Sequence, residues 1–491
     1  MQLSKLIQIL ENKHVTGSPD RDISGICADS RHVTGSCLFV AISGTQTDGH
    51  LFIRQAVQSG AAAVVFRKGY PLEKGFLQEF VSVTTFIEVP DTQRALGQLA
   101  DIYFDHPSSK LKLIGITGTN GKTTTATLLH HLFGELGYKC GLISTIANYI
   151  ENREIPTSHT TPDALTINDL LDKMWRSGCT YCFMEVSSHA IVQDRILGLR
   201  FAGGIFTNLT HDHLDYHKTF AAYRDAKKGF FDTLPENSFA LVNDDDKNGK
   251  VMIQNCRAAK YTYACKKMAD YNARILENSV DGMQLNIDGT EVWSSLIGMH
   301  NAYNLLAVYA CSRLLEAPKE DTLRILSSLK TVSGRMEYVR GGNNITAVVD
   351  YSHTPDALKN VLLTLKELLK PGQELVCVVG CGGNRDKTKR PVMAQIADQY
   401  SHMCVFTSDN PRFEDPEDIL DQMMAGLSPE QQSRHLRITD RRQAIKTAVR
   451  TARPGTVILV AGKGHETYQD IQGVKTHFDD KEILREILKT G

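Results

Sequence analysis

The segment GITGTNGKTTT, residues 115–125, carries the residue types of a phosphate-binding loop. It follows an apolar run and precedes a helical pattern that stops at Gly137. A strand, a glycine turn and a helix N-terminus together form a cradle for phosphate oxygens. The strict P-loop pattern has glycine where this chain has Ile116, so we interpret the segment as a variant P-loop, with a plain glycine turn as the alternative. The phosphate contacts are expected from Gly118, Thr119, Asn120, Gly121, Lys122, Thr123 and Thr124.

A carboxylate follows the next clear strand in the same part of the chain. Glu185 ends the apolar segment YCFME, and a carboxylate at a strand end can hold Mg²⁺ directly or through water. A solvated strand-end glutamate is the alternative. The nearby P-loop, whose Thr123 hydroxyl is placed for the same ion, favours the metal role.

The segment HDHLDYH, residues 211–217, contains three histidines and two aspartates. A zinc hydrolase is one interpretation, but Tyr216 separates Asp215 from His217 where the dinuclear pattern needs adjacent residues. One histidine that joins Glu185 on magnesium suits the P-loop better. On the helix predicted to follow, Lys227 and Lys228 are adjacent, and the residues alone do not favour either one.

Length and composition describe an ordinary globular protein of about three domains. The chain has 491 residues, 42% of them hydrophobic, and a formal net charge of -1, which gives no basic surface for nucleic acid. No apolar run approaches the ~20 residues of a membrane span, and the N-terminus has no signal-peptide pattern, so we expect a cytoplasmic protein. Eleven cysteines indicate free thiols. Cys179 and Cys182 could form a redox or half-zinc motif, but no second pair completes it.

The alternation of strands and helices predicts an α/β protein with three domains. Residues 1–90 form a small N-terminal α/β module, with strands at 36–42 and 61–66 around a helix at 52–59. Residues 91–334 form a central P-loop domain with a doubly wound parallel sheet. Residues 335–491 form a C-terminal Rossmann-like α/β domain, whose strands include ELVCVVG, MCVFTSDNP, HLRITD and TVILVAG and whose helices include RRQAIKTAVRTA.

Polar motifs follow the strands of the last domain, where open α/β sheets bind ligands. They are SGRMEYV, VVDYSHTPDAL, GCGGNRDKTKRPVM, TSDNPRFED and VAGKGHE. Such a concentration of acids, lysines and arginines suits a small zwitterion and a nucleotide phosphate better than an apolar ligand.

With these motifs in order, from DSRHVTGSCLFVAISG to AGKGHE, the whole chain resembles the Mur ligase family. The resemblance implies transfer of the ATP γ-phosphate to a carboxylate, followed by attack of an amine on the acyl phosphate. Within the family the chain looks like the members that add meso-diaminopimelate to the UDP-muramoyl dipeptide in the cytosolic synthesis of peptidoglycan. A monomer without membrane or nucleic-acid partners is expected.

The resemblance also assigns roles to residues by motif. Lys122 belongs to the catalytic set, and Thr123, Glu185, His213 and Lys227 match the magnesium site, with Lys227 carbamylated by carbon dioxide. The remaining ATP contacts are Asn301, Arg335, Asp350 and His353. The contacts to the UDP substrate are Ser30, Thr160, Thr161, Ser187, Gln193 and Arg195.

The segment DNPR matches the signature of the diaminopimelate-adding members. Arg412 could bind the second carboxylate of diaminopimelate with two hydrogen bonds, and lysine would leave that guanidinium unpaired, so lysine should be a poor substrate. The chain departs from the residues common in the family at Asn384, at Ser352 and at the end of residues 188–190. These differences leave the expected reaction unchanged. The contacts to diaminopimelate are expected from Arg390, Asp409, Asn410, Pro411, Arg412, Gly462 and Glu466.

Three other interpretations compete with this one. A folylpolyglutamate synthase or the dipeptide-adding ligase of the same superfamily is disfavoured by DNPR and by the N-terminal DSR segment. A P-loop switch or motor leaves the polar motifs of the last domain unexplained. A catalytically silent scaffold is hard to reconcile with Lys122, Glu185, His213 and Lys227 together. ATP turnover that requires both other substrates would separate all three from a ligase.

Overall fold

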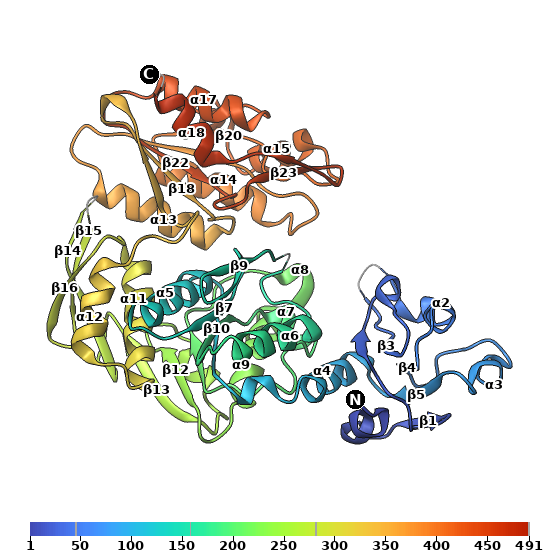
Figure 1. The fold of residues 1–491 in the computed structure, drawn as a ribbon. Coiled ribbons are helices and arrows are strands. Elements are labelled where there is room, and N and C mark those ends of the chain that lie inside the picture. The colour runs from blue at the N-terminus through green and yellow to red at the C-terminus, as the bar shows by residue number, and fades with distance from the viewer. Residues whose placement is uncertain (45–46, 158, 280–281, 490–491) are drawn as a thin grey trace.

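The computed structural model describes residues 1–44, 47–157, 159–279 and 282–489, and three open sheets follow one another along the chain (Figure 1). Each sheet carries helices on both faces, so each has two apolar cores. The predicted α/β architecture is therefore confirmed. The domain boundaries at 90/91 and 334/335 stay predictions.

The N-terminal sheet has five strands in the order β1-β5-β4-β3-β2. Its elements are α1 (Leu3–Leu6), η1 (Ile7–Ile9), β1 (His14–Thr16), β2 (Gly25–Cys27), η2 (Ser30–His32), β3 (Cys37–Val40), η3 (Gly49–Phe52), α2 (Ile53–Gln58), β4 (Ala63–Arg67), α3 (Phe76–Phe80), β5 (Thr85–Val89) and α4 (Thr92–Tyr103). Both faces of β4 are apolar because Val65 packs in the core with α1 and α4, whereas Phe66 packs in the core with α2 and α3. The predicted strands at 36–42 and 61–66 and the helix at 52–59 are confirmed.

The central sheet has 11 strands in the order β16-β15-β14-β13-β12-β11-β6-β10-β7-β8-β9. Its elements, after η4 (Pro107–Ser109), are β6 (Lys112–Thr117), α5 (Lys122–Glu135), β7 (Cys140–Ile143), β8 (Asn148–Ile150), β9 (Arg153–Ile155), α6 (Ala164–Arg176), β10 (Tyr181–Glu185), α7 (Ser188–Val192), β11 (Gly203–Phe206), α8 (Leu214–His217), α9 (Phe220–Asp232), β12 (Phe239–Asn243), α10 (Gly249–Met252), β13 (Ala259–Ala264), β14 (Tyr271–Ser279), β15 (Gly282–Ile287), β16 (Thr290–Ser294), α11 (Met299–Leu314) and α12 (Lys319–Ser328). Strands β7, β10, β6, β11, β12 and β13 are parallel, and β6 lies between β10 and β11. The loop after β6 therefore opens at a point where the strand order reverses, which is where such sheets bind ligands.

The C-terminal sheet has six strands in the order β17-β18-β22-β19-β20-β21. Its elements are β17 (Glu337–Arg340), η5 (Gly342–Asn344), β18 (Thr346–Asp350), α13 (Pro355–Leu368), β19 (Leu375–Val379), α14 (Lys389–Tyr400), β20 (Met403–Phe406), α15 (Pro416–Met424), α16 (Pro429–Ser433), β21 (Leu436–Arg437), α17 (Arg441–Thr451), β22 (Val457–Ala461), β23 (Tyr468–Ile471), β24 (Val474–His477) and α18 (Asp480–Lys489). Helices α13, α14 and α15 share a core on one face, and α17 and α18 share a core on the other. The hairpin β23-β24 forms a separate two-stranded sheet.

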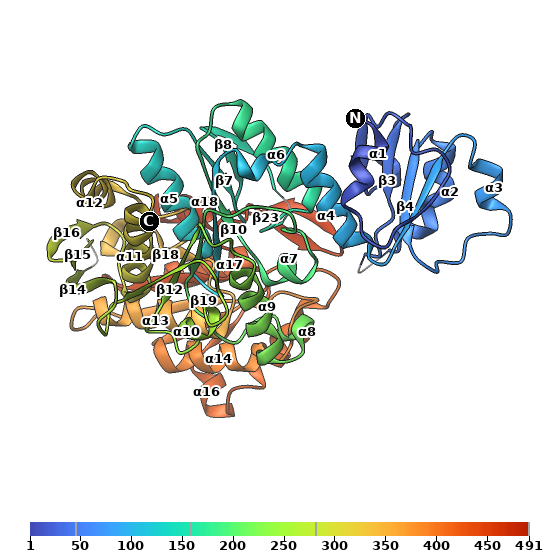
Figure 2. The ribbon, with the colours of Figure 1, turned by 90° about the horizontal axis from the view of Figure 1, so that it is seen from below.

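The C-terminal domain lies over the central domain, and the N-terminal sheet projects to the side beyond α4 (Figures 1 and 2). Helix α4 packs on the N-terminal sheet and also contacts α6, so it joins two domains. Among the described residues, no helix has both the length and the apolar composition needed to cross a membrane.

Candidate active site

A single polar cavity of 840 Å³ lies between the central and C-terminal domains. Its lining includes the P-loop at one end and the DNPR and GKGHE segments at the other. Of the residues predicted from the sequence, it collects Thr119, Asn120, Gly121, Lys122, Thr123, Thr124, Thr160, Glu185, His213, Asn301, Arg335, Asp350, His353, Asp409, Asn410, Arg412, Gly462 and Glu466. The cavity does not collect Gly118, Ser30, Thr161, Ser187, Gln193, Arg195, Lys227, Arg390 or Pro411.

The P-loop keeps its shape through two glycines with positive φ. A Cβ atom on Gly118 (φ +152°) would lie 1.9 Å from Thr207 Oγ1, and one on Gly121 (φ +86°) would lie 2.6 Å from Asn304 Oδ1. The position where a strict P-loop has glycine, Ile116, lies inside β6 and is fully buried in the sheet core. The turn therefore begins two residues later than in the strict pattern, and α5 still starts at the lysine.

Lys122 folds back over this loop. Its Nζ donates to the carbonyl oxygens of Gly118 at 2.9 Å and Thr119 at 2.8 Å. Burial lowers the pKa of Lys122, and the nearby Glu185 and Asp212 carboxylates oppose that shift. The Lys122 cation is therefore held beside the backbone amides of the P-loop, where it is suited to bind an outer phosphate.

Glu185, which the sequence predicted as a magnesium ligand, is a buried carboxylate at the end of a strand. It ends β10 with no exposed surface, and its Oε1 accepts a hydrogen bond from the Thr145 amide at 2.8 Å. Its Oε2 is also buried and has no hydrogen-bond partner among the described residues. A buried carboxylate oxygen left in this state is costly unless a cation or donor satisfies it, so this atom fits a magnesium ligand.

The histidine cluster surrounds the same region. His213 lines the cavity from the N-terminus of α8, with its Nε2 3.4 Å from Asp212 Oδ2. Burial lowers the pKa of His213, which keeps the imidazole neutral and able to donate a lone pair. Among the residues that the structure describes, no three His, Cys, Asp or Glu side chains are arranged to hold a metal by themselves. The side chain of Asp215 lies outside the described part of the chain.

Asp212 was not singled out from the sequence, although it lines the cavity next to His213. Burial acts to raise the pKa of its carboxyl, but His213, His353 and Lys389 outweigh burial and lower it. An acidic residue within a histidine-rich loop is the sequence signal that could have identified Asp212 as a site residue.

The structure separates the two adjacent lysines of α9. Lys227 is 1% exposed, and its Nζ donates to the Gly118 carbonyl at 2.8 Å, directly under the P-loop. Lys228 instead pairs with Asp232 one turn along the helix, at 2.7 Å. The packing of α9 sets this orientation: Phe230, on the same face as Lys227, fits against Gly115 in β6, where a Cβ atom would lie only 2.5 Å from its ring.

Burial and the neighbouring Lys122 cation hold the pKa of Lys227 well below its usual range. The lowered pKa favours the neutral amine, which is the form that reacts with electrophiles.

The residues predicted for the UDP substrate form one hydrogen-bond network beside Glu185, except for Ser30. Arg195 binds the Gln193 side chain and donates to the Thr161 carbonyl at 2.8 Å, and Thr161 Oγ1 accepts from the Ser187 amide at 3.1 Å. Thr160 bonds to Thr145. Ser30 lies apart in η2 of the N-terminal domain, where its hydroxyl donates to Gln55 at 3.3 Å.

On the nucleotide side, the C-terminal domain touches the P-loop. Arg335 Nη2 donates to Thr123 Oγ1 at 3.3 Å, and its guanidinium lies 4.6 Å from the centre of the Tyr351 ring. Asp350 accepts the amides of Met336 and Ser352, each at 2.8 Å, so its carboxylate fixes the turn that presents Arg335. The hydrogen bond from Arg335 to Thr123 thus joins the C-terminal domain to the phosphate loop of the central domain.

Two further predicted residues of the nucleotide side are engaged within their own elements. The Asn301 amide donates to the Ile297 carbonyl at 2.9 Å and accepts from Asn304 at 3.1 Å. The His353 ring lies 2.8 Å from the Tyr351 carbonyl, and burial lowers its pKa to about 4, so it is neutral at physiological pH.

The residues predicted for the amino-acid end line the cavity except for Arg390 and Pro411. Arg412 lines it with a left-handed backbone, φ +52°, and its Nη1 donates to the Gly383 carbonyl at 2.9 Å. Arg390 is fully buried, and its guanidinium is divided between Glu414, Gln422 and the Gly382 carbonyl. The predicted contact of Arg390 with a ligand therefore has no support from its position.

Arg385, five residues earlier, lines the cavity near Arg412 and was missed in the sequence. The structure gives it no hydrogen bond or ion pair with another described residue, so its guanidinium is available to a ligand. Its position in the sequence was the available signal. Arg385 precedes α14, in the loop after β19, whereas Arg390 is already inside the helix.

The departures from the family pattern have local roles. Asn384 Oδ1 accepts from the Phe413 amide at 3.0 Å, which ties two loops of the amino-acid end together. Ser188 Oγ lies 2.8 Å from His217 Nε2, and Ser352 is buried with a hydroxyl that has no hydrogen-bond partner among the residues that the structure describes. All 11 cysteines are free, as expected, including Cys179 and Cys182.

Three family models match the chain in sequence. They are the catalytic domain of the Mur ligase family over residues 22–104, the Mur ligase middle domain over 116–312 and the glutamate ligase domain of Mur ligases over 334–464.

The relatives found in sequence cover the chain from end to end. The UDP-N-acetylmuramoyl-L-alanyl-D-glutamate 2,6-diaminopimelate ligase of Cytophaga hutchinsonii is 52% identical over 490 residues, which are 100% of this chain and 99% of the relative. The ligase of the same name from Bacteroides fragilis is 52% identical over 99% of both chains, and that from Clostridioides difficile is 40% identical over 99% of both.

Solved structures give the same picture. The structure of a ligase of this name matches with a TM-score of 0.67 at 32% identity, covering 99% of this chain and 98% of the other. MurF from Acinetobacter baumannii matches with a TM-score of 0.65 at 16% identity, covering 95% of this chain and 93% of that one, and shares the fold.

Proposed function

The chain belongs to the Mur ligase family, and on that premise we propose that it joins meso-diaminopimelate to UDP-N-acetylmuramoyl-L-alanyl-D-glutamate in an ATP-dependent, ADP-forming reaction of peptidoglycan synthesis. The observation that carries the proposal is the cavity that the P-loop shares with the DNPR and GKGHE segments. It provides room for a nucleotide phosphate at one end and a charged amino acid at the other, with Glu185 lining it as well.

At the nucleotide end, this chain's residues position the γ-phosphate. Backbone amides of the P-loop would hold its oxygens, Lys122 would neutralise its charge, and Arg335 would hold the two domains closed against Thr123. We assign the purine side to Asn301 and the closing turn to Asp350 and His353. The substrate carboxylate takes the phosphoryl group, which leaves ADP, and the resulting acyl phosphate is the electrophile for the amine.

Magnesium fits the residues between the two ends. We propose Glu185, His213 and Thr123 as its ligands, supported by the unpartnered Oε2 of Glu185. When bound, the ion would neutralise charge on the transferring phosphoryl group. We further propose that Lys227 carries a carbamate, supported by its burial and by the lowered pKa, which favours the neutral amine.

The UDP substrate would span the central and N-terminal domains. The network of Thr160, Thr161, Ser187, Gln193 and Arg195 is adjacent to Glu185, where the acid that is phosphorylated must end. Ser30 lies in a different domain and would contact the far, uridine end. A long nucleotide-sugar peptide accounts for contacts so widely separated.

At the amino-acid end, we propose that Arg385 and Arg412 bind the carboxylates of diaminopimelate and that Glu466 binds an ammonium group. Asp409, Asn410, Pro411 and Gly462 then shape the pocket. Gly462 has no room for a side chain because a Cβ atom would lie 2.4 Å from Asp409 Oδ2. We propose a cytoplasmic monomer without membrane or nucleic-acid partners.

The function is tested by ADP release from the purified protein with Mg-ATP, the UDP-muramoyl dipeptide and meso-diaminopimelate, each left out in turn. We expect turnover only with all three substrates present. ADP release that is independent of the dipeptide and the amino acid would instead indicate a switch or a simple ATPase.

Arg385 and Arg390 make a matched pair for testing the amino-acid end. Arg385→Ala should raise the KM for diaminopimelate by about 10- to 100-fold with an unchanged melting temperature, because it removes a charge-assisted contact from an exposed side chain. Arg390→Ala should destabilise the fold by about 3 kcal/mol, because it leaves the Glu414 carboxylate without its main partner. Steady-state kinetics and thermal melts of both variants check this. A raised KM in Arg390→Ala without lost stability would restore Arg390 as a ligand contact.

A further inference from the structure

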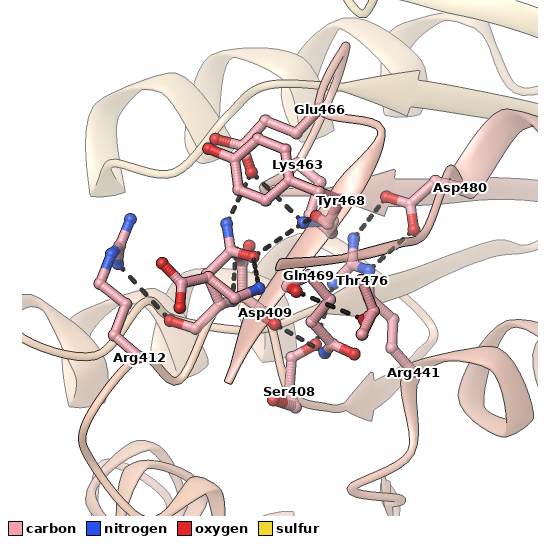
Figure 3. A network of polar contacts seen from close by, with 12 residues as sticks. Ser408, Asp409, Arg412, Arg441, Lys463, Glu466, Tyr468, Gln469, Thr476 and Asp480 are labelled. Atoms are coloured by element: carbon pink, nitrogen blue, oxygen red, sulfur yellow. Dashed lines mark hydrogen bonds and ion pairs between the residues drawn. The ribbon is translucent and has the colours of Figure 1, made fainter. Parts of the chain in front are cut away.

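Lys463 is a buried cation that the proposed chemistry has not used. It follows β22 in the segment AGKGHE and has no exposed surface. Its Nζ lies 3.1 Å from Asn410 Oδ1 and 3.3 Å from Glu466 Oε2, and it also donates to the Tyr468 carbonyl (Figure 3). Because it is fully buried and does not line the cavity, Lys463 cannot itself contact a ligand.

Asn410 is the point where these contacts meet. Its Oδ1 accepts from Lys463 and from the Asp470 amide at 3.0 Å, and its Nδ2 donates to Glu466 Oε2 at 2.7 Å. The oxygen and the nitrogen of the Asn410 side-chain amide are thereby both oriented by protein groups. Asn410 thus holds Glu466 in place.

The hairpin β23-β24 holds the adjacent recognition loop, residues 409–412. The Arg412 amide donates to the Asp470 carbonyl at 3.0 Å, and the Gln472 amide donates to the Arg412 carbonyl at 2.7 Å. Gln469 donates to the Asp409 carbonyl at 2.8 Å. Since Tyr468 and Asp470 both belong to β23, Lys463 and the hairpin fix one unit that carries Arg412 and Glu466 together.

The charges around Glu466 leave Lys463 as its ion-pair partner. Burial raises the pKa of Glu466, Asp409 raises it further, and Lys463 and Asn410 oppose them. Tyr351 and Tyr468 also face this carboxylate. Arg441 is close as well, but its guanidinium is committed to Asp480, with Nε 2.8 Å from Oδ1 and Nη2 2.7 Å from Oδ2 (Figure 3). In the part of the chain that the structure describes, Lys463 forms the only ion pair with Glu466.

We propose that Lys463 is a positioning residue of the amino-acid site, which fixes the Asn410 amide and keeps the Glu466 carboxylate ionised to receive an ammonium group of the incoming amino acid. The role rests on the proposed function, because it presupposes that Glu466 binds that ammonium group. Removal of Lys463 would leave Asp409 and Glu466 near each other without a direct cation, and one of them would take up a proton more readily.

The test is Lys463→Met, which keeps the chain length and removes the charge. The KM for diaminopimelate should rise by about 10- to 100-fold, whereas the KM values for ATP and the UDP-muramoyl dipeptide should stay within about twofold. The acid limb of kcat/KM for diaminopimelate should move to higher pH by about one pH unit, because a carboxyl without its cation protonates at higher pH. Lys475→Met is the matched control: that lysine lies 4.3 Å from the same Tyr468 ring but is exposed and bonds to neither Asn410 nor Glu466.

An equal rise in all three KM values, or an unmoved acid limb, would show a structural lysine and overturn the proposal. If Lys463→Met does not fold, Lys463→Gln keeps a neutral donor, and the presence or absence of the same pH shift decides in its place. Failure of the unsubstituted protein to use diaminopimelate would refute the proposed function instead, so the two failures are distinguishable.

Discussion

Lys227→Ala is expected to lower kcat for ADP formation by about 10³-fold, the scale of loss when one charge-stabilising group is taken from an enzyme site. The side chain is 1% exposed, its Nζ lies 2.8 Å from the Gly118 carbonyl oxygen of the P-loop, and burial beside the Lys122 cation lowers the pKa of its amine. A neutral amine adds to carbon dioxide and releases a proton, which leaves a carbamate anion in place of a cation. Initial rates of ADP release, measured with saturating substrates, check the loss.

Three variants separate a carbamate from a plain structural lysine. Lys227→Arg keeps a cation and a donor but forms no carbamate, so it should be as inactive as Lys227→Ala. Added formate or acetate should partly restore Lys227→Ala, because a small carboxylate can occupy the vacated space. Lys228→Ala, one residue away and paired with Asp232 instead of the P-loop, should retain full activity. An active Lys227→Arg, or no rescue by carboxylates, would remove the carbamate from the reaction.

Local sequence patterns predicted the elements because their causes are local. Continuous apolar runs become the buried strands β6, β10, β19, β20 and β22, and the glycines and polar residues that follow them become the loops of the cavity. Since the carboxyl ends of parallel strands meet at one edge of a sheet, motifs far apart in the chain could be expected to converge. The order of the strands, with β6 between β10 and β11, depends on long-range packing and was not predictable in this way.

The direction in which a side chain points was the part that the sequence could not give. Lys227 and Lys228 differ only in helix face, and that face is set by Phe230 packing on Gly115, 115 residues earlier in the chain. Arg385 and Arg390 share one motif, yet only the first reaches the cavity. Family resemblance favoured Lys227 over Lys228, whereas nothing in the sequence separated the two arginines in this way. The role of Lys463 was hidden for the same reason, because its partner Asn410 lies 53 residues earlier in the chain.

The ratio of kcat/KM for meso-diaminopimelate over L-lysine is expected to be about 10⁴ to 10⁵, the discrimination reached by sites that bind a group which the rejected analogue lacks. Arg412 is the reason. The hairpin holds its backbone on both sides, and Nη1 is anchored to the Gly383 carbonyl at 2.9 Å, so the guanidinium cannot swing into solvent when its ligand is missing. Lysine has no second carboxylate and would leave this half-buried cation unpaired, which costs far more than the contact alone contributes. Competing initial rates with the two amino acids measure the ratio.

The same argument predicts what Arg412→Ala does to the ratio, which separates it from a general loss of activity. Without the guanidinium, the kcat/KM for diaminopimelate should fall by about 10²- to 10³-fold, whereas that for lysine should rise, because lysine gained nothing from Arg412 and no longer leaves it unpaired. The ratio should therefore collapse through opposite changes for the two substrates. Lys475→Met, on the outer strand of the supporting hairpin, should leave the ratio intact. Comparable use of lysine by the unsubstituted protein, or an Arg412→Ala variant that slows both substrates equally, would show that specificity is set elsewhere in the pocket.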